Sequence, residues 1–182
     1  MDTVVLDNEL AWQDVLPVQW RPLPGPPDRF ELLALDESNL QLLQACVAVE
    51  EHPLGDGTEA LGPLAGEIAR LEFKLNLVMQ LLSKLVETDL KASATNITFN
   101  SVGATWTCIE APPALHAYGL LRVQLRASLP QALELPSQVL AVEGANVRVG
   151  FPALSESVAE LIQKLAFLRH RRHVADVRKA RG

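Results

Sequence analysis

The chain has 182 residues, of which 48% are hydrophobic, and a formal net charge of -6. This composition is sufficient for a packed core and excludes wholesale disorder, and the length suits one domain with an elaboration. No run of about 18 apolar residues occurs, so we expect no membrane span. An acidic start, MDTVVLDNELAWQDVL, and only two cysteines, Cys46 and Cys108, predict a cytoplasmic rather than a secreted protein.

The first predicted elements are a strand and a helix. Residues 16–25, LPVQWRPLPG, predict one short strand near Trp20 that ends in a loop rich in Gly and Pro. Residues 28–50 then carry leucines at helical spacing. We expect this helix to break near Asp36, with Asp36 or Ser38 capping the second piece.

Residues 61–92 contain the most regular pattern of the chain, a heptad repeat that predicts one long helix. Its a and d positions are all apolar: Leu61, Leu64, Ile68, Leu71, Leu75, Val78, Leu82 and Leu85. An apolar seam that repeats every 3.5 residues requires a partner helix, so these residues are the predicted oligomerisation site. Further apolar residues widen the stripe after Lys74, which favours a parallel homotetramer over a dimer. The alternative is that the helix buries its seam against its own chain.

After residue 92 the hydrophobic period falls to two, which predicts β-strands. Strands are expected within residues 95–109, 117–128, 133–143 and 145–151, with a hairpin turn at Glu143-Gly144-Ala145-Asn146. Together with the strand near Trp20, these make five or six antiparallel strands. That number is enough for a small barrel or sandwich.

A final helix is predicted to begin around Ser155. Its apolar side consists of Val158, Leu161, Ile162, Leu165 and Leu168. Residues 169–182 carry six Lys or Arg against one acid, which predicts a solvated basic helix end. The acidity of the rest of the chain argues against nucleic-acid binding. His170 and His173 lie one helical turn apart without a third ligand, so no metal site is predicted. No arrangement of nucleophile and base is legible, so no enzyme is predicted.

A lone N-terminal strand is not stable by itself, so it must join the strands that follow the helices. We therefore expect an α+β fold in which residues 1–182 form a single domain. A small antiparallel β-barrel is interrupted by a helical insertion at residues 35–92, which contains the heptad repeat at 61–92. A C-terminal helix at residues 154–182 completes the fold.

The order of the later segments resembles the bacterial PilZ domain. The resemblance rests on a short Asn-Ile-Thr strand, GLLRVQLRASLP, QVLAVEG, NVRVGF and a helix ending in RHRRH, and it covers residues 16–27 and 94–175. It implies a six-stranded β-barrel and a role in cyclic di-GMP signalling, such as motility, attachment or virulence.

PilZ domains bind cyclic di-GMP through RxxxR before the first strand and [DN]xSxxG at the next one, because paired arginines clamp phosphates and stack on guanine. Here the second motif is degenerate: Asn96 fits, Thr98 replaces Ser, and Ser101 stands where Gly is expected. Residues 1–20 contain no Arg or Lys. The RxxxR at Arg122–Arg126 falls within a predicted strand and is expected to be two exposed arginines on one face.

The resemblance therefore implies an atypical member with weak or no direct cyclic di-GMP binding and no other cofactor. We expect an oligomeric adaptor that acts through other signalling proteins. One alternative is a genuine receptor that uses other arginines, such as Arg21, Arg29 or those at the C-terminus. Another is a purely structural coiled-coil assembly module.

Overall fold

The computed structural model describes residues 3–6, 9–51, 70–71, 74–75, 78, 93–109, 111–126, 129 and 131–179, without the side chains of residues 3–6, 9 and 173–179. The strands are β1 (Thr3–Leu6), β2 (Glu9–Leu23), β3 (Ala94–Phe99), β4 (Gly103–Thr107), β5 (Tyr118–Val123), β6 (Leu133–Glu143) and β7 (Asn146–Gly150). The helices are α1 (Arg29–Glu51) and α3 (Glu156–Lys179).

Six of these strands form a closed antiparallel barrel in the order β2-β3-β4-β7-β6-β5. The barrel closes because β2 has two partners: Trp12–Pro17 pair with β3, whereas Val18–Leu23 pair with β5. The short strand β1 lies outside the barrel and pairs with the start of β2. The α+β fold with a six-stranded barrel, expected from the sequence, is confirmed.

The start of the chain differs from the expected single short strand. It forms two strands, and β2 has 15 residues. The inward-facing pattern that the sequence shows at Val18 and Trp20 continues backwards to Leu16 and Trp12, both buried. One long strand can therefore serve both β3 and β5, which two short strands could not do without a break in the barrel wall.

The predicted break in the first helix is wrong, because α1 runs without interruption from Arg29 to Glu51. Its N-terminus is capped by Asp28, whose Oδ1 accepts hydrogen bonds from the backbone N–H groups of Phe30 at 2.8 Å and Glu31 at 2.9 Å. The Asp28 N–H in turn donates to Glu31 Oε2 at 2.9 Å, which completes a capping box. Ser38 lies mid-helix and bonds to Gln131 instead of capping.

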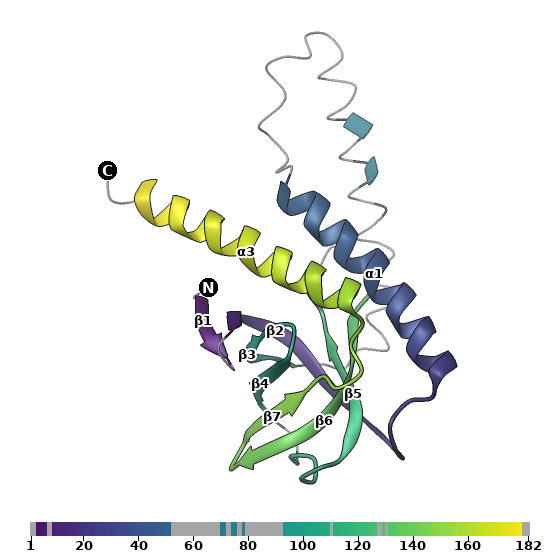
Figure 1. Cartoon of the computed structure of the whole chain (residues 1–182). Coiled ribbons are helices and arrows are strands. Elements are labelled where there is room, and N and C mark those ends of the chain that lie inside the picture. Colours follow the sequence, from purple (N-terminus) through teal and green to yellow (C-terminus); the bar gives the residue numbers. More distant parts are fainter. Residues whose placement is uncertain are drawn as a thin grey trace.

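Figure 1 shows α1 and α3 lying against each other over the barrel. Each helix contributes one apolar side to a core shared with the barrel interior: Leu42, Leu43, Cys46 and Val47 from α1, and Val158, Ile162, Leu165 and Ala166 from α3. The predicted apolar side of the last helix is thus confirmed, with Leu161 and Leu168 partly buried at its margins. Ser155 caps this helix through a bond from the Val158 N–H at 3.2 Å.

The predicted hairpin between the last two strands is also confirmed. Glu143 pairs with Asn146, and Gly144 has a φ of 61°. A two-residue turn with positive φ at its first central position favours glycine there. The helices in the described part of the chain include no segment with the length and hydropathy of a membrane span.

Candidate functional site

The three residues of the degenerate PilZ motif do not converge on one site. Asn96 and Thr98 lie on the outer face of β3, where they alternate with the buried Ile97 and Phe99. Ser101 follows β3 in the turn and is buried. Its hydroxyl accepts a hydrogen bond from Gln163 Nε2 of α3 at 3.0 Å, so the C-terminal helix occupies this position.

The turn after β3 is held by its own backbone and by Asn100. The Asn100 Oδ1 accepts from the N–H groups of Val102 at 2.9 Å and Gly103 at 3.0 Å, while the Asn100 N–H donates to the Gly103 carbonyl at 3.0 Å. A Cβ at Gly103 would lie 2.4 Å from the Val149 carbonyl oxygen on β7. The glycine is therefore required by the close approach of two strands.

The RxxxR pair is not two exposed arginines on one strand face, as the sequence suggested. Arg122 on β5 bonds through Nε to Glu134 Oε1 at 2.6 Å, and its Nη1 donates to Gln19 Oε1 at 3.0 Å. Arg126 lies beyond the end of β5, and its Nη2 bonds to Glu50 Oε1 at 2.5 Å. Both side chains are about three-quarters buried, so each arginine already holds a carboxylate of this chain.

The strongest concentration of charge in the described residues surrounds Glu50, in the last turn of α1. Its side chain is only 5% exposed and forms ion pairs with three arginines: Arg126 and Arg172 at 2.5 Å each, and Arg169 at 3.5 Å. Arg169 also lies 3.8 Å from Asp14. We call these five residues the arginine–carboxylate cluster. It joins β2, the end of β5, α1 and α3.

Arg169 corrects the prediction of a solvated basic helix end. Only 8% of it is exposed, and its guanidinium lies 5.1 Å from the centre of the Trp12 ring. Burial lowers the pKa of Arg169, while the carboxylates of Glu50 and Asp14 act in the opposite direction. An arginine keeps its charge in such surroundings because its ordinary pKa is so high. The start of the basic segment is therefore part of the protein interior.

The cluster also fixes the C-terminal end of α1. Arg172 Nη2 donates to the Glu50 carbonyl oxygen at 3.0 Å, which satisfies one of the open carbonyls at that helix end. Lys164 of α3 pairs with Glu51 at 2.8 Å. Because the residues come from distant parts of the sequence, no local pattern reveals the cluster. The one feature of the sequence that points towards the cluster is the excess of arginines at the C-terminal end.

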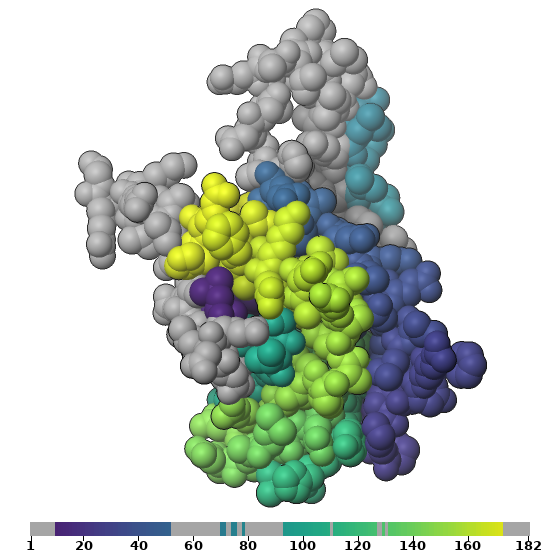
Figure 2. Space-filling model, in the orientation of Figure 1, coloured from purple at the N-terminus to yellow at the C-terminus, as the bar shows by residue number. Residues whose placement is uncertain are grey.

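Three residues of the predicted oligomerisation site lie within the described part of the chain. Leu71, Leu75 and Val78 are helical, and they are 62%, 63% and 51% exposed in the single chain. Figure 2 shows the residues coloured between 70 and 78 projecting beyond the barrel, past the C-terminal end of α1. The other predicted members, Leu61, Leu64, Ile68, Leu82 and Leu85, fall outside the described residues.

The described residues contain no group of three or more His, Cys, Asp or Glu that is arranged to hold a metal ion. Cys46 and Cys108 are free thiols, one buried and one half-buried. Burial raises the pKa of the Cys46 thiol.

Comparison with protein-family models decides the family. The model of the atypical PilZ domain, described as a cyclic di-GMP receptor, matches residues 43–179. The chain belongs to the atypical PilZ domain family. The resemblance found in the sequence is thereby confirmed, and the match extends it back through the end of α1 and residues 52–92.

A solved structure supports the same fold for this PilZ chain. It is a pathogenic protein from Xanthomonas campestris, described as a tetrameric PilZ domain self-assembled via an unusual helical bundle. The two are 22% identical, the similarity covers 93% of each chain, and the TM-score is 0.69. At this identity the likeness shows the fold. Comparison with curated proteins gives no match.

Proposed function

We propose that this atypical PilZ protein is an oligomeric adaptor in cyclic di-GMP-linked regulation, with weak or no direct nucleotide binding. The observation that carries the proposal is the exposure of Leu71, Leu75 and Val78, each more than half accessible in the single chain. Their spacing of four and three residues places them on one side of a helix. Large apolar side chains so arranged are stabilised by burial against other copies of the same helix.

A tetramer built through the heptad seam is the assembly that we favour, with a dimer as the alternative. The Xanthomonas protein of similar fold is described as a tetramer assembled through a helical bundle, which supports a tetramer here. In this proposal residues 35–92 form an insertion within a single domain. The insertion ties several barrels together, and presenting them as a group raises the avidity for other signalling proteins without new contacts.

Weak or absent nucleotide binding is supported by the polar side chains that a nucleotide would need, because they already bond to other residues of this chain. The Ser101 hydroxyl bonds to α3, and Arg122 and Arg126 each hold a carboxylate of the chain. An arginine must leave such a partner before it can clamp a phosphate. That exchange costs about as much as the new charge-assisted bond contributes.

The seam is tested by the mass of the oligomer. Leu75→Asp, alone and with Leu71→Asp, introduces a charge into the predicted seam, and we expect the assembly to dissociate in light scattering. Arg70→Asp is the matched control, since Arg70 is also exposed and helical but lies outside the a and d positions. Wild-type mass in the double variant, or dissociation by the control alone, would contradict the seam.

A genuine cyclic di-GMP receptor is the second candidate, favoured by the description of the matching family as a cyclic di-GMP receptor. Arg21 and Arg29 are exposed and could contribute. Calorimetric titration with cyclic di-GMP distinguishes the two. Micromolar or tighter binding would replace the adaptor reading, and heat at the level of buffer dilution would support it.

The compartment and the output are part of the same proposal. The two free thiols, Cys46 and Cys108, suit the reducing cytoplasm. Motility, attachment or virulence are the outputs that we propose, and deletion of the gene with assays for each would test them. A deletion without any effect on cyclic di-GMP-dependent behaviour would favour a purely structural assembly module.

A further inference from the structure

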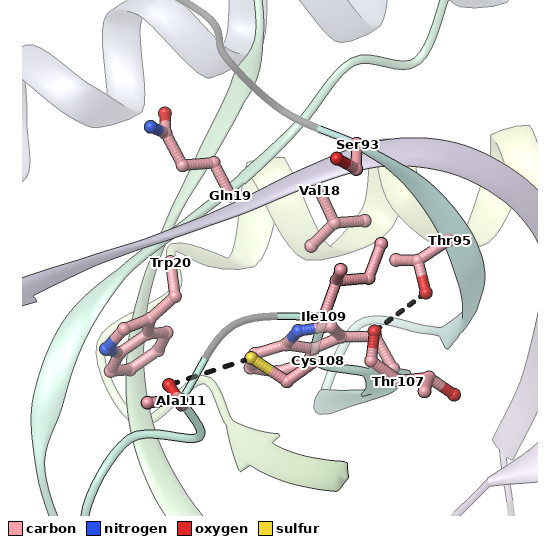
Figure 3. Close-up of a pocket in the computed structure, with 10 residues that line it drawn as sticks. Val18, Gln19, Trp20, Ser93, Thr95, Thr107, Cys108, Ile109 and Ala111 are labelled. Carbon is pink, nitrogen blue, oxygen red and sulfur yellow. Dashed lines mark hydrogen bonds between the residues drawn. The ribbon is translucent and has the colours of Figure 1, made fainter.

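One end of the barrel, where β3 begins and β4 ends, contains a cavity of about 130 Å³. It exists because β2 changes partners at this level: Pro17 is the last residue paired with β3, and Val18 is the first paired with β5. The pairing of β2 with β3 ends at Pro17, and the cavity lies at this end of the β2–β3 pairing. Figure 3 shows Val18, Ser93, Thr95, Ile109 and Trp20 around this space.

The rim of the cavity is fixed by hydrogen bonds. Thr95 Oγ1 donates to the Thr107 carbonyl oxygen at 2.7 Å, and the Cys108 thiol lies 3.9 Å from the Ala111 carbonyl oxygen (Figure 3). The Trp20 indole lies over Gly119, where a Cβ would be only 2.3 Å from the ring. The glycine thus makes room for the aromatic wall.

Two indole rings line the cavity. The Trp20 and Trp106 rings are 23° from parallel, with centroids 6.1 Å apart. Trp106 is only 4% exposed, and its indole N–H donates to no other described residue, yet this nitrogen does not belong to the fully buried atoms that lack a partner, so it stays accessible to water. An occupant that displaces this water without supplying an acceptor would leave the N–H unpaired, which costs free energy. An occupant that carries an acceptor avoids this cost.

The lining carries no charged side chain among the described residues. An anionic or cationic ligand group would therefore lose its hydration without gaining a partner. The volume is close to that of cavities of about 150 Å³ that accept benzene. The cavity consequently suits one six-membered ring, with any second ring reaching towards the rim.

We propose that this cavity binds a neutral, planar heteroaromatic ring with a hydrogen-bond acceptor. The ring packs against Trp20 and Trp106 and accepts a hydrogen bond from an indole N–H. Such a ring can come from a nucleoside base or from a non-nucleotide compound such as a quinolone. This site goes beyond the adaptor role. It borders Ser93, where the chain returns from the insertion, and the Ser93 carbonyl oxygen accepts from the Val18 N–H at 3.4 Å.

The test uses the full chain and three probes: guanosine, quinolin-4-one and toluene. Binding is followed by tryptophan fluorescence and calorimetry. We expect saturable binding of guanosine or quinolin-4-one, and at least tenfold weaker binding of toluene, which has no acceptor. Either ring binding supports the proposal, and the tighter one identifies the source.

Two variants locate the binding. Ala111→Phe fills the rim and should weaken binding at least tenfold, whereas Ala114→Phe, at an exposed alanine of the same loop that does not line the cavity, should leave it unchanged. Trp106→Phe keeps an aromatic ring but removes the N–H donor. It should abolish the preference over toluene, and circular dichroism checks that each variant is folded.

The proposal is overturned if neither heteroaromatic ring binds saturably, or if Ala111→Phe and Ala114→Phe bind equally well. Toluene binding as tight as that of the other probes would overturn the requirement for an acceptor. Unchanged selectivity in Trp106→Phe would also overturn the assigned donor.

Discussion

Substitution of Glu50 by Gln tests the arginine–carboxylate cluster directly. The amide keeps the shape of the side chain but removes the charge that faces Arg126, Arg169 and Arg172. Arg169 is the most affected, because it is 8% exposed and would retain the Asp14 carboxylate at 3.8 Å and the Trp12 ring in place of Glu50. A buried guanidinium would then have lost most of its compensation.

The expected magnitude follows from the burial of each partner. Removing one partner of a buried ion pair costs about 3–5 kcal/mol. The other two arginines, Arg126 and Arg172, are 26% and 41% exposed and can regain water, so the lower end applies. We expect the free energy of unfolding to fall by about 3 kcal/mol, which corresponds to a loss of about 6–12 °C in melting temperature for a chain of this size.

The assay is urea denaturation at a fixed protomer concentration, because self-association would add to the apparent stability. Glu51→Gln is the matched control: it is the next residue of the same helix, 37% exposed, and its partner Lys164 is 49% exposed. That pair should contribute about 1 kcal/mol or less. Equal losses in the two variants would refute the view that the buried cluster holds α1 to α3.

Three further substitutions or modifications probe other parts of the structure. Gly103→Ala places a methyl group against a carbonyl oxygen of β7, and urea titration should show the free energy of unfolding lowered by about 1–3 kcal/mol. Gly25→Ala is the control, because the space around Gly25 is open and the free energy of unfolding should change little. Asn39→Ala removes two hydrogen bonds to the β6 backbone and should lower the free energy of unfolding by about 2–4 kcal/mol in the same titration. A decrease below about 1 kcal/mol would contradict a stabilising role for those two bonds. The Cys46 thiol is buried and its pKa is raised, so iodoacetamide should label Cys108 first in the native protein at pH 8. Mass spectrometry follows the labelling of each cysteine, and faster labelling of Cys46 would contradict its burial.

The barrel was predictable because its strands carry a local signal. Alternation around Val123, and turn residues at Gly144, mark segments whose positions need no tertiary information. The continuity of α1 was also legible in principle, since Asp28 and Glu31 stand three residues apart at its start, as a capping box requires. Ser38 made a break in this helix look plausible, because serine is common at the first positions of helices.

The arginine–carboxylate cluster could not be predicted, since Asp14, Glu50, Arg126 and Arg169 meet only after the barrel closes and both helices dock. A basic C-terminal segment looks the same in the sequence whether its first arginine is solvated or buried. The cavity beside Trp20 was hidden for a similar reason. It arises from the change of partner along β2, which depends on the register of three strands.

The double pairing of β2 has a consequence for the order in which the chain folds. Trp12 pairs with Phe99 and Leu23 pairs with Tyr118, so both partners of β2 are synthesised only after residues 35–92 are complete. Barrel closure is therefore a late, non-local event, and such events are slow. In the proposed assembly, self-association through the heptad seam can precede barrel closure, and it would hold several unclosed barrels at high local concentration. Under these conditions a β2 strand can pair with the β3 and β5 of a neighbouring protomer, so exchange of this strand is the characteristic misassembly that we expect.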